Sequence, residues 1–140
     1  MPKLPMERYT IRLLIVHPDI SAEEIDNRVG LTARHFWSQG EPRRTPNGRQ
    51  LGGFRTETTW CHVTRTQGRR HFFAGVRDLV RHLQPRHRFL TQWTAGGGHL
   101  SLTINLPGDV NMGDDLEPET LRLMSDLGIG LGVEVFPKMK

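Results

Sequence analysis

Apolar and polar residues alternate between residues 9 and 16, which is the strongest strand pattern in the chain. Tyr9, Ile11, Leu13 and Ile15 fall on one face of this segment. Side chains of a strand point alternately to its two faces, so this face is expected to pack on the core. The second half of the segment, LLIV, is apolar on both faces, which predicts a central position in the sheet.

A short helix is predicted next, from residue 21 to residue 29. Ser21 suits the N-cap position, and Glu24 follows at the capping-box spacing. Ile25 and Val29, four residues apart, share one face of this helix. Gly30 is expected to end it, because glycine adopts the left-handed conformation of a helix C-terminus at little steric cost.

Two further elements follow a long irregular region. Residues 57–65 alternate and are rich in β-branched side chains, which predicts a strand. Residues 70–83 have a helical period, with one apolar stripe and arginines nearly opposite it. Pro85 is expected to end this helix.

The last third predicts a hairpin, a helix and a strand. Residues 89–94 and 100–106 are expected to pair as two strands across Gly96-Gly97-Gly98. A helix over 117–127 begins with Pro118 in its first turn and acidic residues around it, as the helix dipole favours. The strand 129–136 is expected to turn its apolar residues inward: Ile129, Leu131, Val133 and Val135.

The predicted order is therefore βαβαββαβ. It indicates an α+β two-layer sandwich of a mixed or mostly antiparallel sheet, with helices mainly on one face. A chain of 140 residues suits a single domain over 1–140. Its ends, 1–7 and 137–140, are expected to be loosely ordered.

The segment 31–56 is too long for an ordinary connection in a compact domain. Pro46-Asn47-Gly48 is a turn signal, and Gly52-Gly53 gives a second flexible point. We expect a long loop that contains one hairpin. Loops of this length are commonly functional, which makes the segment the first place to look for a site.

Charge is unevenly distributed along the chain, although the net charge is only +4. Residues 27–108 contain thirteen arginines and three acids, whereas seven acids lie beyond residue 108. An Arg-rich middle suits an acidic protein partner or nucleic acid. With a single cysteine, no signal-peptide pattern and no long apolar run, the chain is expected to be cytoplasmic and not to bind a membrane.

Two tryptophans bracket the Arg-rich segment, and two interpretations of them remain open. Trp37 and Trp60 either anchor the long loop on the core, which is the favoured interpretation, or line a groove with the arginines. Aromatic and arginine side chains together are typical of protein interface hot spots. The candidate binding residues are Arg34, Trp37, Arg43, Arg44, Arg49, Arg55 and Trp60.

Catalytic and metal chemistry receive little support from the sequence. Cys61 and His62 are adjacent and so point to opposite faces of a strand, and no H-x-x-x-H or C-x-x-C spacing occurs. Gly96-Gly97-Gly98 is placed between strands, without the helix N-terminus that phosphate loops use. We expect no metal, no cofactor and no catalytic residue, and an enzyme is the less favoured class.

Several motifs, in their order and spacing, resemble a bacterial family called domain of unknown function 4279. They are the opening YTIRLLI, the segment WSQGEP, the helix FFAGVRDLVRHL and the closing LEPETLRLMSDLGIGLGVEVF. The residues that carry the match are Gly30, Leu31, Trp37, Gly40, Pro42, Trp60, Glu119, Leu121, Leu127, Gly128 and Ile129. The resemblance covers nearly the whole chain and implies its fold. It implies no activity, cofactor or catalytic residue, and the Arg-rich stretch 43–55 departs from it.

These observations lead to a functional hypothesis. The chain is expected to be a small binding module, immunity-like or regulatory, that recognises a protein with an acidic surface through the segment 30–60. The alternative is nucleic-acid binding by a basic helix face formed by Arg70, Arg77 and Arg81. A homodimer formed through the strand that contains Gly130 and Gly132, or through an exposed sheet edge, is a further expectation.

Overall fold

A five-stranded mixed sheet forms the centre of the computed structural model, which describes residues 8–67, 71–108 and 111–137. The strand order is β2-β5-β1-β6-β7, and every neighbouring pair is antiparallel except β6 and β7. The strands are β1 (Arg8–His17), β2 (His35–Trp37), β5 (Thr58–Gln67), β6 (His99–Pro107) and β7 (Ile129–Phe136). β1 is central, as its apolar second half predicts.

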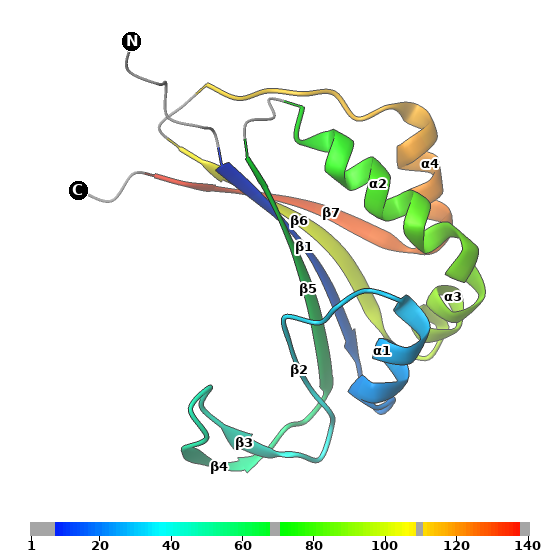
Figure 1. Ribbon diagram of the computed structural model, residues 1–140. Coiled ribbons are helices and arrows are strands. Elements are labelled where there is room, and N and C mark those ends of the chain that lie inside the picture. Colours follow the sequence, from blue (N-terminus) through cyan, green and yellow to red (C-terminus); the bar gives the residue numbers. More distant parts are fainter. Residues whose placement is uncertain (1–7, 68–70, 109–110, 138–140) are drawn as a thin grey trace.

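The helices cover one face of this sheet and leave the other face open (Figure 1). They are α1 (Ala22–Val29), α2 (Phe73–Leu83), the 3₁₀ turn η1 (Gln84–Arg86), α3 (His87–Ala95) and α4 (Pro118–Leu127). The predicted α+β two-layer sandwich with helices on one face is therefore confirmed. No helix in the described ranges has the length and apolar character needed to cross a membrane.

The core lies between the sheet and the helices, where the sequence places it. Ile11, Leu13 and Ile15 of β1 are fully buried, and so are Leu102 and Ile104 of the neighbouring β6. The apolar stripe predicted within residues 70–83 is buried as well, through Phe72, Val76, Leu79, Val80 and Leu83.

The ends of α1 form as their local sequence predicts. The Oγ of Ser21 accepts a hydrogen bond from the backbone N–H of Glu24 at 3.1 Å. Gly30 has φ of 71° at the C-terminus, and a side chain there would also meet the guanidinium of Arg86. Helix α1 is therefore fixed at one end by its own cap and at the other by a residue distant in sequence.

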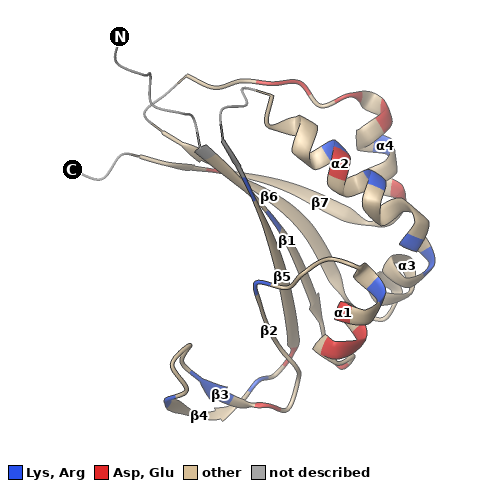
Figure 2. Ribbon diagram, in the orientation of Figure 1, with Lys and Arg blue, Asp and Glu red and all other residues tan. Residues whose placement is uncertain are grey.

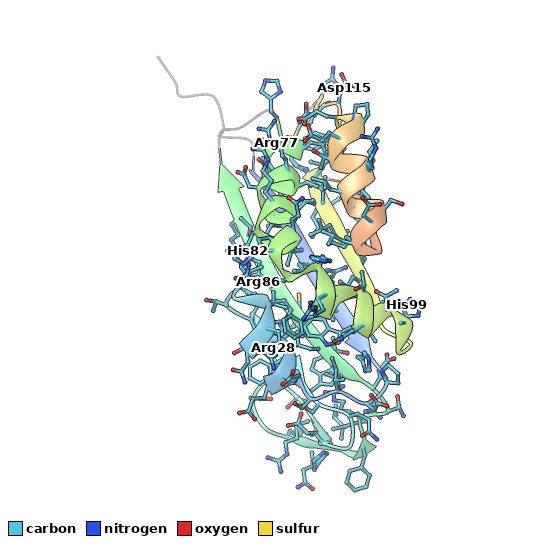
Figure 3. The ribbon with its side chains drawn as sticks, turned by 90° about the vertical axis from the view of Figure 1, so that its right-hand side faces the viewer. Arg28, Arg77, His82, Arg86, His99 and Asp115 are labelled. Carbon is cyan, nitrogen blue, oxygen red and sulfur yellow. The ribbon has the colours of Figure 1, made fainter. Side chains whose placement is uncertain are left out.

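Arg86 and His82 hold the C-terminus of α1 against the helix layer. Arg86 donates from Nε to the carbonyl of Arg28 at 3.1 Å, and His82 Nε2 lies 3.0 Å from the carbonyl oxygen of Val29. Figure 3 shows Arg28, His82 and Arg86 gathered on the helix side of the molecule. The guanidinium of Arg86 is favourable at the exposed carbonyls of a helix C-terminus, and both side chains contact this end of α1, so their role is structural.

The predicted strand 89–94 is wrong, because this segment belongs to α3. Leu90 and Trp93 are buried at helical spacing. Thr91 and Thr94 donate from Oγ1 to the carbonyls of His87 and Leu90, four residues earlier. The two threonine hydroxyls thus form hydrogen bonds with backbone carbonyls of the same helix. The high β propensity of the segment therefore does not determine its conformation.

Helix α2 ends at Leu83, before Pro85 as expected, but the helical run continues through η1 into α3. Pro85 occupies the first turn of η1, where its missing N–H costs no hydrogen bond. Gly96-Gly97-Gly98 ends α3 instead of turning a hairpin, with Gly98 N–H donating to the Trp93 carbonyl at 2.7 Å. A Cβ on Gly98 would lie 2.6 Å from the same oxygen, so glycine is required for this approach.

The prediction that β7 turns its apolar residues inward holds only at its first residue. Ile129 is buried, whereas Leu131, Val133 and Val135 are 38%, 51% and 60% exposed. These three residues point to the helix side of the sheet, since they are level with buried residues of β6. Helix α4 packs on β7, but only the first residue of the strand, Ile129, is buried.

A small hairpin projects from the sheet near the start of β5, on the open side of the molecule (Figure 1). It is a separate two-stranded sheet of β3 (Pro42–Arg44) and β4 (Gln50–Phe54), within the segment 31–56. The sequence did not predict β2, which ties the start of the segment to β5. The predicted loose ends, 1–7 and 137–140, lie outside the described residues except for Pro137.

Candidate functional site

Hydrogen bonds connect the base of the hairpin to the start of α1 and to the first residue of β5. Ser38 Oγ accepts from the backbone N–H of Ala22 at 2.8 Å, which satisfies a free donor at the start of α1. Thr58 Oγ1 accepts from Gln39 N–H at 2.9 Å and donates to the carbonyl of Ile20. The hairpin therefore starts from a fixed point between α1 and the start of β5.

The two arms of the hairpin are joined at both ends. Gly40 N–H donates to the Arg55 carbonyl at 2.9 Å, and Arg55 N–H donates to the Glu41 carbonyl at 2.8 Å. At the tip, Thr45 N–H donates to the Arg49 carbonyl at 2.8 Å. Gly48 in this turn has φ of 89°, which a non-glycine residue rarely adopts.

A groove separates the hairpin from β2, and we call it the hairpin groove. Its cavity measures about 1160 Å³. It is lined by Arg34, His35, Phe36, Trp37, Glu41, Pro42, Arg44, Thr45, Pro46 and Arg55. One wall is thus an edge strand of the main sheet, and the other is the hairpin.

Trp37 and Arg55 form the floor of the hairpin groove. The Arg55 guanidinium lies 4.1 Å from the centre of the Trp37 ring, within the range of a cation–π contact. Arg55 also donates to the Arg44 carbonyl at 3.3 Å, and the His35 ring stacks near Trp37 with centroids 6.5 Å apart. The half-buried Trp37 thus has both a structural contact and a surface open to the groove.

Large apolar side chains are exposed on β2, which lines this groove, and on the hairpin. Phe36, Leu51 and Phe54 are 57%, 49% and 67% exposed. Phe54 also lines a second cavity of about 340 Å³, which shares Trp37 and Arg55 with the hairpin groove. Exposed aromatic residues grouped with arginines are characteristic of an interaction surface.

Six of the seven predicted binding residues therefore lie on or beside the hairpin. Arg34, Trp37, Arg44 and Arg55 line the groove, Arg43 lines the second cavity, and Arg49 is exposed at the tip. The sequence analysis did not single out Phe36, Leu51 or Phe54. The signal available for the last two was LGGF, an apolar pair around two glycines in an otherwise polar loop.

Trp60 is separated from the other predicted residues. Its side chain is fully buried under the helices, and its indole Nε1 donates to Asp26 Oδ1 of α1 at 3.2 Å. The ring stacks near His62, with centroids 6.4 Å apart. Trp60 is therefore a core anchor, whereas Trp37 faces the groove.

The alternative basic face on α2 is interrupted by acids. Arg77 donates to Glu117 at 2.8 Å, and the exposed Asp78 lies next to it in sequence. Arg81 is exposed, and Arg70 lies outside the described residues. Figure 2 shows acidic segments mixed with basic ones over the helix layer, whereas basic residues mark the projecting hairpin.

Cys61 lies on the open face of the sheet and is 1% exposed. Burial raises the pKa of its thiol, and the positive charges of Arg12 and Arg34 offset only part of this effect. The side chain is thus held as a thiol, the form that is weakly nucleophilic. Among the residues that the structure describes, no group of three His, Cys, Asp or Glu side chains is arranged to hold a metal ion.

The sequence matches one protein family over residues 7–136, and its description is Domain of unknown function (DUF4279). The match covers nearly the whole chain, so the protein belongs to this family. No curated protein and no solved structure is significantly similar to the chain. This family is the one that the sequence motifs resemble. Its description assigns no function, so a function has to be inferred from the geometry of the hairpin groove.

Proposed function

We propose that this member of the DUF4279 family is a protein-binding module that recognises an acidic partner through the hairpin groove. The observation that carries the proposal is the exposure of Phe36 and Phe54 beside a groove with Arg34, Arg44 and Arg55 in its walls. Aromatic and arginine side chains supply most of the binding energy in protein interfaces. Glu41 is the single acid among the groove residues, so the surface favours an acidic partner.

Fixed geometry also supports binding. The floor residue Trp37 lies in a strand paired with β5, and the hairpin base is hydrogen-bonded to α1. A surface that is already ordered loses less conformational entropy when a partner docks. The hairpin groove therefore resembles a preorganised interface more than an unstructured basic tail.

The test uses two variants with the same change of charge. Arg43→Glu with Arg44→Glu reverses the charge of the hairpin, and Arg81→Glu with Arg88→Glu reverses two exposed arginines of the helix layer. Immobilised wild-type protein would be used to capture partners from an extract of the native cell. We expect an acidic protein to be retained by the wild type and the helix variant and lost from the hairpin variant.

Three results would count against this proposal. Equal loss from both double variants would mean that net charge, and not the groove, determines binding. Retention of the acidic protein by both double variants would mean that the interface lies outside the hairpin groove. Tight, salt-sensitive binding of a mixed-sequence oligonucleotide would instead favour nucleic acid, because counterion release makes such binding fall steeply with added salt.

A further inference from the structure

The two edges of the main sheet are built differently. The edge strand β2 has three residues, and the chain leaves it to form the hairpin. The edge strand β7 has eight residues, and within the described part of the chain no strand pairs with its outer side. A short edge resists unwanted pairing, whereas a long apolar edge is open to it.

The side chains of β7 reinforce this difference. Leu131, Val133 and Val135 are exposed on the helix side of the strand, and Phe136 at its end is 55% exposed. Glu134 is the one charged residue of the strand, and it points to the open face. The usual protection of an edge, by lysines, prolines or inward charges, is thus absent between Ile129 and Phe136.

We propose that β7 pairs with β7 of a second copy of this chain, in antiparallel orientation across a two-fold axis at Val133. Directly opposed residues of antiparallel strands point to the same face of a sheet. Val133 then lies opposite its own symmetry mate, and Leu131 lies opposite Val135 of the other copy. All six apolar side chains fall on the helix side, and the two sheets become one ten-stranded sheet.

Charge and side-chain volume favour this register over its neighbours. Glu134 lies opposite Gly132 of the other copy, which has no side chain, so no two carboxylates are opposed. A two-fold axis at Glu134 would place the two carboxylates directly opposite each other, which is destabilising. A register that opposes Gly132 to Val133 would place Leu131 on the same face as Glu134 and the helix layers on opposite faces, which no two-fold axis between the copies can produce.

A second copy suits this strand better than an unrelated partner because the strand is complementary to itself. An isologous contact closes after two copies and satisfies both exposed edges at once. The same pairing extends the apolar face that Leu102 and Ile104 of β6 begin, because these residues are level with Leu131 and Val133. The dimer surface is separate from the hairpin groove, so this inference does not depend on the proposed function.

The test measures the mass of the full chain by sedimentation equilibrium at high salt. We expect a concentration-dependent dimer of twice the 16.0 kDa chain mass. Val133→Lys replaces the central apolar pair by two opposed ammonium groups, and the loss of apolar contact together with the repulsion is expected to raise the dissociation constant about tenfold. Leu51→Lys, at a residue of similar exposure on the hairpin, is the matched control and is expected to leave the dimer intact.

The register is tested by disulfide formation, which also serves if the lysine variant folds poorly. Val133→Cys is expected to cross-link two copies under oxidation, because its Cβ lies opposite that of its mate. Glu134→Cys lies opposite a glycine and is expected not to cross-link. A monomer at every concentration, a dimer unaffected by Val133→Lys, a dimer lost in Leu51→Lys, or preferential cross-linking at residue 134 would each overturn the proposal.

Discussion

Trp60→Ala is expected to remove about 4 kcal/mol from the free energy of unfolding, estimated from the area and cavity costs of a buried aromatic side chain. An indole side chain buries about 200 Å². At about 25 cal/mol per Å², its transfer from water contributes about 5 kcal/mol. Substitutions of buried Phe or Trp by Ala typically cost about 3–5 kcal/mol. Trp60 is fully buried, so the whole of this cost applies.

Trp37→Ala provides the comparison, because this ring is only half-buried. Part of the ring stays in contact with water, so the expected loss is smaller, about 3 kcal/mol together with the Arg55 contact. The assay is urea unfolding followed by far-ultraviolet circular dichroism, with the slope of the transition checked for two-state behaviour. Equal losses for the two variants, or a loss below about 1 kcal/mol for Trp60→Ala, would refute the assignment of Trp60 as the core anchor.

Three further variants or treatments test other parts of the structure. Gly98→Ala is expected to lower the free energy of unfolding by about 1–3 kcal/mol through its clash with the Trp93 carbonyl, whereas Gly113→Ala, with open space around it, should change thermal stability little. Arg86→Ala removes two hydrogen bonds to carbonyls of α1 and α2, and a fall of about 1–2 kcal/mol in a denaturant titration is expected. The thiol of Cys61 should react with an alkylating reagent far more slowly in folded than in unfolded protein. Folding raises the pKa of the Cys61 thiol, so the contribution of this group to the free energy of unfolding is complete below about pH 9 and is lost as the pH rises further. Urea unfolding at a series of increasing pH values would measure this loss.

Features set by neighbouring residues were predictable from the sequence. The N-cap at Ser21 and the left-handed Gly30 depend on side chains within one turn of α1, and both form as expected. The apolar faces of β1 and α2 were also identified, because each is long and strictly periodic. The segment 89–94 favours a strand in sequence because it is short and rich in residues with high β propensity, but it folds as part of α3.

The remaining errors concern which surfaces are covered, and this depends on distant parts of the chain. Alternation placed Leu131, Val133 and Val135 on one face of β7 but could not show where α4 ends above that strand. The sequence likewise does not show which of the two tryptophans is covered by helices. Trp60 is opposite Ile15 in the register of β5 and β1, on the helix side, whereas Trp37 is on the open side. Only the strand register and the position of the helices decide that Trp60 is buried while Trp37 faces the hairpin groove.

Self-association driven by charge would have to be distinguished from the dimer proposed above. The hairpin is basic, and the helix layer contains acidic segments in α1 and α4 (Figure 2). Contact between the hairpin of one copy and the helix layer of the next would be head-to-tail, so it would not close after two copies. Such contacts are screened by salt, whereas apolar burial and strand pairing at β7 persist. A dimer that survives high salt and dissociates in Val133→Lys therefore belongs to β7, and larger species that vanish with salt and with the Arg43, Arg44 double variant belong to the hairpin.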